Sequence, residues 1–133
     1  MQAKSFLIFG LFVSLFAVKA AFAQEGHPLK GSWIGDWGPN PNDRNQITLV
    51  MDWDGQRVSG ILNPGPGAIP IQKASLEPKG WLVHFEADAK NPAGRAVHYV
   101  VDGHIENLGL YNRSIVGTWS HDNVKGDFKI TRQ

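Results

Sequence analysis

The chain has 133 residues, with 13 basic and 12 acidic side chains, a formal charge of +1 and no cysteine. A length of this order predicts one domain. The near-neutral charge offers no electrostatic footprint for nucleic acid, so we expect no nucleic-acid partner. The absence of cysteine excludes disulfide bonds and a lipid-modified cysteine.

Residues 1–23 have the pattern of a secretory signal peptide. Lys4 supplies a positive start, residues 6–18 are apolar, and small residues precede a cleavage point after Ala23. The apolar run is too short for a permanent transmembrane helix, and Lys19 interrupts it. We therefore expect a periplasmic or secreted bacterial product with no integral membrane segment in its mature chain. Removing the leader leaves eleven basic and twelve acidic side chains, a formal charge of −1.

Alternating apolar and polar residues recur through the rest of the chain, and no stretch has a helical period. After a short N-terminal extension, residues 24–30, we expect a single β-barrel domain over 31–133. The alternation and its turn signals, among them Asp54-Gly55, predict eight strands. These strands are residues 31–37, 46–53, 56–62, 69–76, 81–87, 95–105, 113–120 and 124–132.

One face of the predicted strands is apolar and contains all five tryptophans, and the opposite face is polar. Such a sheet covers its apolar face either by closing into a barrel or by stacking as a sandwich. Gly35, Gly60, Gly117 and Gly126 share the inward phase and favour closure, because glycine relieves crowding where strands bend sharply. In the fourth strand the phase slips, which predicts a bulge near Lys73.

Two features at the ends of the predicted sheet point to a known family. The triplet Gly31-Ser32-Trp33 opens the first strand, and Arg132 closes the last. On these residues the chain resembles the calycin superfamily of lipocalin-like and avidin-like barrels, and it also resembles small exported bacterial proteins without an assigned activity. The resemblance implies an eight-stranded antiparallel up-and-down barrel in which Arg132 stacks on Trp33 and closes one end.

The longer predicted connections gather at one end of such a barrel, where a mouth would open. An eight-stranded barrel is either filled by side chains or able to hold one small ligand. We expect a non-catalytic binding module for a small, mostly apolar ligand carrying one acidic group. The residues predicted to form this site are Trp37, Leu62, Phe85 and Val97, beneath Asn42, Arg44, Lys90 and Arg95.

Two other functions remain open. A filled barrel would act through its outer surface as a protein-interaction or inhibitor module, with an apolar patch around Val50 and Val100. The second alternative is a metal site for zinc or copper at His84, His98 and Glu86, if the fifth and sixth strands place the two histidines opposite each other. A solvated outer face that carries histidines by chance gives the same pattern, and a one-residue slip in register destroys the constellation.

Enzyme signatures are missing from the sequence. It contains no Gly-x-Ser-x-Gly elbow, no His-Glu-x-x-His and no phosphate-binding loop, so we predict no catalytic residues. We expect no cofactor either, and haem is disfavoured because no histidine is assigned to the inward phase.

Overall fold

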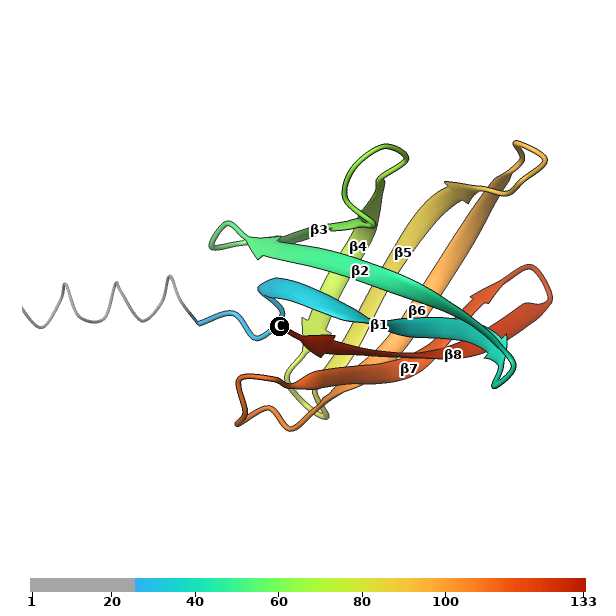
Figure 1. The fold of residues 1–133 in the computed structure, drawn as a ribbon. Helices are drawn as coiled ribbons and strands as arrows, with labels where there is room; N and C mark the ends of the chain where they lie inside the picture. Colours follow the sequence, from blue (N-terminus) through green and yellow to red (C-terminus); the bar gives the residue numbers. More distant parts are fainter. Residues whose placement is uncertain (1–25) are drawn as a thin grey trace, which may run out of the picture.

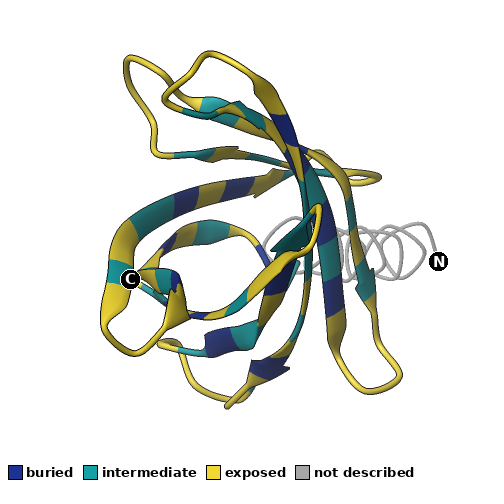
Figure 2. Ribbon diagram, turned by 90° about the vertical axis from the view of Figure 1, so that its right-hand side faces the viewer, coloured by how far each residue is buried: buried dark blue, intermediate teal, exposed yellow. Residues whose placement is uncertain are grey.

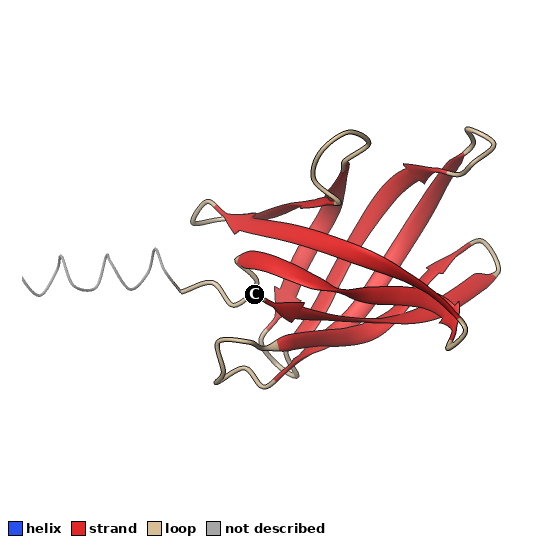
Figure 3. Ribbon diagram, in the orientation of Figure 1, coloured by secondary structure: helices blue, strands red, loops and turns tan. Residues whose placement is uncertain are grey.

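The computed structural model describes residues 26–133, which form eight antiparallel strands closed into a barrel (Figures 1 and 3). The strands are β1 (Gly31–Asn40), β2 (Asp43–Trp53), β3 (Val58–Leu62), β4 (Ile69–Glu77), β5 (Leu82–Lys90), β6 (Ala96–Glu106), β7 (Ser114–His121) and β8 (Val124–Arg132). Each strand pairs with the next in the chain, and β8 returns to pair with β1. The predicted up-and-down barrel is confirmed.

The predicted signal peptide, with its cleavage point after Ala23, lies outside the described residues. Within residues 26–133 no helix has the length and hydropathy needed to cross a membrane.

Strand boundaries differ from the prediction mainly at the mouth end. β1 continues to Asn40 and β2 begins at Asp43, so the first connection is a tight turn. The side-chain oxygen of Asn40 accepts hydrogen bonds from the backbone N–H groups of Asn42 and Asp43, at 2.9 and 3.0 Å, which stabilises this turn. The predicted bulge near Lys73 is confirmed, because the register with β5 shifts between Gln72 and Ser75 and Lys73 has a φ of 53°.

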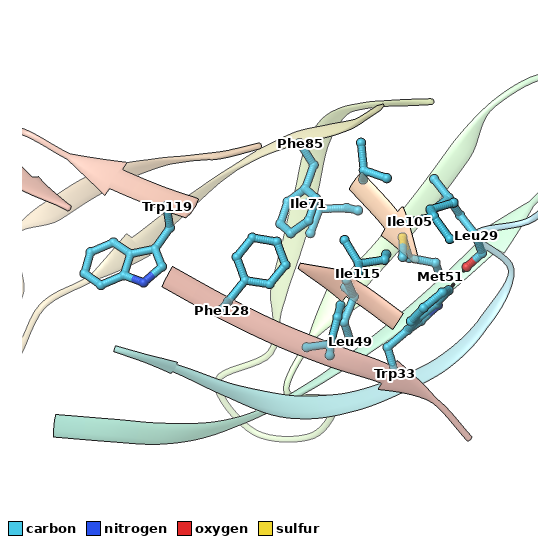
Figure 4. Packing of buried hydrophobic residues seen from close by; sticks show 12 residues of the cluster. Leu29, Trp33, Leu49, Met51, Ile71, Phe85, Ile105, Ile115, Trp119 and Phe128 are labelled. Carbon is cyan, nitrogen blue, oxygen red and sulfur yellow. Dashed lines mark hydrogen bonds between the residues drawn. The ribbon is translucent and has the colours of Figure 1, made fainter. Parts of the chain in front are cut away.

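Buried and exposed residues alternate along the strands, as the period of two requires (Figure 2). The apolar core extends from Trp33, which is 0 % exposed at the closed end, to Phe128 and Trp119 towards the mouth (Figure 4). Leu29, from the segment predicted as an extension, is 1 % exposed in this core. Its carbonyl oxygen accepts a 2.9 Å hydrogen bond from Trp33 Nε1, so the segment before β1 closes this end of the barrel.

One tryptophan departs from the predicted inward face, and a second is only half-buried. Trp81 lies before β5, has a φ of 51° and is 36 % exposed, so its prediction as an inward residue is wrong. The cause is a turn one residue longer than predicted, in which the Trp81 N–H donates to the carbonyl of Pro78. Trp53, at the end of β2, is half-buried, and its ring centroid lies 5.3 Å from that of His27.

Candidate functional site

A cavity of about 270 Å³ opens at the end of the barrel where the 63–68 and 91–95 connections lie. Its wall is almost entirely apolar or aromatic, and Asn63 and Lys90 supply an amide and a charge. The other lining residues are Trp37, Ile47, Leu49, Leu62, Ile69, Phe85, Ala87, Ala89, Tyr99, Val101, Trp119, Phe128 and Ile130. The interior is therefore packed at the closed end and hollow near the mouth.

Three aromatic rings from different strands form one side of the cavity. The Trp37 and Trp119 centroids are 5.0 Å apart in an edge-on arrangement, and the Tyr99 ring lies 6.1 Å from Trp37 and 6.0 Å from Trp119. Trp119 Nε1 donates a 3.1 Å hydrogen bond to the Asp127 carbonyl, which fixes its ring. These rigid rings present flat apolar surfaces to whatever enters the cavity.

His121, at the end of β7, packs against two of these rings without lining the cavity itself. Its ring stacks on Trp119 with a centroid distance of 5.9 Å and an interplanar angle of 10°, and lies 4.8 Å from Tyr99. The prediction that no histidine has the inward phase is therefore wrong. The signal was present in the sequence, because His121 stands two positions after the inward Trp119.

The structure brings together only part of the predicted ligand site. Trp37, Leu62 and Phe85 line the cavity. Val97 is 9 % exposed and pairs with Ala89, but it is not among the lining residues.

The two predicted arginines do not line the cavity. Arg44 lies on the outer surface, where it makes ion pairs with Asp36 at 2.6 Å and with Asp127, so it links β1, β2 and β8. Arg95 is exposed in the 91–95 connection, where its backbone N–H donates to Asn91 Oδ1 at 2.9 Å. Lys90 is the charged residue that lines the cavity.

At the closed end, Trp33 and Arg132 are direct partners in the β1–β8 ladder, as predicted. The guanidinium of Arg132 does not make the predicted contact with the Trp33 ring. Its carbon lies 4.8 Å from the ring centroid of Tyr111, so the stacking partner is this tyrosine from the connection before β7. Trp33 is instead covered by Leu29.

The predicted metal residues lie together on the outer face of β5 and β6, but in a different register. His84 faces Asp102 and His98 faces Asp88, so the predicted pairing of the two histidines is wrong. Glu86 lies between them and accepts hydrogen bonds from both, at 2.9 Å from His84 Nε2 and 2.7 Å from His98 Nε2. We call these five side chains the β5–β6 network.

The remaining ring nitrogens complete this chain of contacts. His84 Nδ1 lies 2.7 Å from Asp102, and His98 Nδ1 lies 2.6 Å from Asp88. Every imidazole nitrogen of the pair thus contacts a carboxylate, an arrangement that is complete when both rings are protonated. Among residues 26–133, no group of three His, Asp or Glu side chains is arranged to hold a metal ion.

The same contacts shift the protonation equilibria. Hydrogen bonds to Glu86 and Asp102 raise the pKa of His84, and those to Asp88 and Glu86 raise the pKa of His98. The two imidazoles lower the pKa of Glu86 to about 2. A raised histidine pKa stabilises the fold below the unfolded value of about 6.5, and the gain is lost as pH rises through the folded pKa. The lowered pKa of Glu86 stabilises the fold above about 4.5, and that gain is lost as pH falls towards 2.

We therefore expect the β5–β6 network to stabilise the barrel most between about pH 4.5 and 6.5. Glu86→Gln removes the shared carboxylate, so the difference in Tm between wild type and variant should be a few degrees at pH 5.5 and smaller at pH 8.5. Thermal unfolding followed by circular dichroism at the two pH values measures this difference. His104→Asn on β6 is the control, because His104 makes none of these contacts. A Glu86→Gln deficit that is equal at both pH values would contradict the protonated network.

The predicted outer patch is divided by the fold. Val50 on β2 pairs with Ile61 on β3, and these side chains are 37 % and 44 % exposed. Val100 lies on β6 between Glu86 and Ser120, so it does not adjoin Val50.

Comparison with known proteins identifies no relative of this chain. No family model, curated protein or solved structure matches the chain.

Proposed function

We propose that this protein is a non-catalytic binding module that holds a small, mostly apolar ligand in the mouth of its barrel. The observation that carries the proposal is the cavity of about 270 Å³ with Trp37, Tyr99 and Trp119 in its wall. Concave apolar sites with few polar groups are the usual form of small-molecule sites. The signal-peptide pattern of residues 1–23 supports action in the periplasm or the medium.

The size and lining of the cavity restrict the class of ligand. Its volume lies just below the range of about 300–1,000 Å³ typical of ligand pockets, which favours a molecule of one or two rings. The flat aromatic wall favours a planar ligand, since stacked and edge-on ring contacts add to the burial of apolar area. Lys90 favours a single acidic group on that ligand, placed towards solvent while the rings enter the cavity.

We expect 1-naphthoic acid to bind the purified protein and its neutral methyl ester to bind several-fold more weakly, because the ester lacks the charge that Lys90 attracts. Isothermal titration calorimetry measures both affinities. Lys90→Met should bring the acid down to the affinity of the ester and leave the ester unchanged. Ala87→Trp, which fills the cavity from the wall of β5, should abolish binding of both compounds.

Lys125→Met is the matched control, since Lys125 is an exposed lysine on β8 that does not line the cavity. Failure of both compounds to bind the folded wild-type protein would contradict the proposal. Equal affinity for the acid and the ester would contradict the proposed interaction of Lys90 with the acidic group, but it would still support an apolar binding site.

A further inference from the structure

The seam between β3 and β4 is the most open in the barrel. These strands pair only at Ile61↔Pro70 and Leu62↔Ile69, whereas β4 continues to Glu77. In Figure 1 the two ribbons meet beside the 63–68 loop and diverge from there. The bulge at Lys73 lies on the diverging part of β4.

The divergence leaves main-chain groups of β3 without a strand partner within the described structure. The Asn63 N–H donates to the Thr48 carbonyl at 2.8 Å, which fixes the positions at which β3 bonds to β2. Because hydrogen-bonding direction alternates along an antiparallel strand, the main-chain groups of Val58 and Gly60 point towards β4. No β4 residue pairs with either of them among residues 26–133. This stretch of β3 is therefore a half-buried strand edge without a ladder partner on its β4 side, inside a closed barrel.

A groove of about 950 Å³ occupies this opening. Its lining combines apolar surface with positive charge and contains no acidic residue. The lining residues are Gly26, His27, Pro28, Gln56, Arg57, Val58, Lys73, Ala74, Ser75, Leu76, Pro78 and Trp81. Arg57 borders the β3 side and Lys73 the β4 side, and both are exposed. The Lys73 ammonium lies 3.6 Å from Glu86, whose oxygens also contact His84 and His98.

We propose that this groove binds an extended acidic segment of a partner protein, which adds as a strand along the free edge of β3. A polypeptide in the β conformation supplies the alternating N–H and C=O groups that Val58 and Gly60 leave free. Its carboxylates complement Arg57 and Lys73, and its apolar side chains cover Val58 and Leu76. A small anion would contact the cations and leave the strand edge unpaired, so the edge favours a peptide. This site is separate from the mouth cavity and does not depend on the ligand proposed there.

A fluorescein-labelled peptide of alternating glutamate and valine is the probe for this site. We expect saturable binding by fluorescence anisotropy, at least tenfold tighter than that of the matching lysine–valine peptide. Arg57→Glu and Lys73→Glu should each weaken binding about fivefold or more, because each replaces an attraction by a repulsion. Lys125→Glu on β8 makes the same charge change away from the groove and should leave the affinity unchanged.

Amide hydrogen exchange distinguishes strand addition along β3 from purely electrostatic binding of the peptide to Arg57 and Lys73. On peptide binding, the amides of Val58 and Gly60 should become protected, while those of the Asp54–Gly55 turn should not. Binding without this protection would overturn the proposal, as would absence of binding by the acidic peptide. Competition by free glutamate as effective as competition by unlabelled peptide would also overturn it, since that result indicates a small-anion site.

Discussion

Gly35→Ala is expected to destabilise the barrel by about 3 kcal/mol or more, a large share of the total of about 5–15 kcal/mol for a domain. A Cβ atom at this position would lie 1.8 Å from the Lys129 carbonyl oxygen and 2.7 Å from the Ile130 Cα. Both contacts are with backbone, so no side-chain rotation relieves them. The substitution must separate β1 from β8, which is the pairing that closes the barrel.

Urea unfolding followed by circular dichroism measures this loss as a fall in the midpoint concentration. Gly109→Ala is the matched control, because no atom lies within 4 Å of a Cβ built there. The control should change stability by less than about 0.5 kcal/mol. A Gly35→Ala protein with a wild-type midpoint would show that β1 and β8 do not approach this closely.

The architecture was predictable because alternation with a period of two assigns faces without any knowledge of partners. The bounds of β8 coincide with the predicted 124–132, and Gly35 and Gly117 stand where a Cβ would strike the backbone of a neighbouring strand. The assignment of side chains to faces is wrong where the length of a turn decides which residue begins the next strand. One extra residue in the turn before β5 was enough to place Trp81 outside the core.

Alternation assigns the face of a strand but not its partner. In the predicted β5–β6 hairpin His84 faces His98, whereas in the structure it faces Asp102, four residues further along β6. A shift of the strand register by an even number of residues keeps every side chain on its predicted face. The hydrophobic pattern therefore cannot distinguish the two registers. The pattern therefore places His84, His98 and Glu86 on one outer face, but it does not show that the cross-strand partners of the two histidines are Asp102 and Asp88.

In the candidate ligand site, too, strand residues are predicted better than residues outside the strands. The inward phase predicts Trp37, Leu62 and Phe85 correctly as cavity-lining residues, but Val97 has the same phase and does not line the cavity. The prediction for the two arginines depends on loop charge alone, which does not indicate where a side chain points. Arg44 instead joins three strands on the outer surface. Leu29 was missed because it lies before the first strand, where no alternation reveals its burial.

Trp33→Ala is expected to cost about 3–5 kcal/mol, because it removes the largest fully buried side chain and leaves a cavity at the closed end. Leu29→Ala should cost about 2–3 kcal/mol for the same reason. The two effects should not add. Trp33 Nε1 bonds to the Leu29 carbonyl at 2.9 Å and the two side chains belong to one cluster, so either substitution alone loosens the contact.

The double variant Leu29→Ala/Trp33→Ala tests this coupling by urea unfolding, with an expected shortfall from additivity of about 1 kcal/mol. Trp33→Phe is the control that keeps an aromatic ring and loses the bond to Leu29, at an expected cost of about 1–2 kcal/mol. Ile115→Ala with Trp33→Ala provides a second cycle within the same buried cluster but without a hydrogen bond between the pair. Additive effects for Leu29 and Trp33 would mean that the segment before β1 packs independently of the barrel end, and the closed end would then depend on the β1–β8 pairing alone.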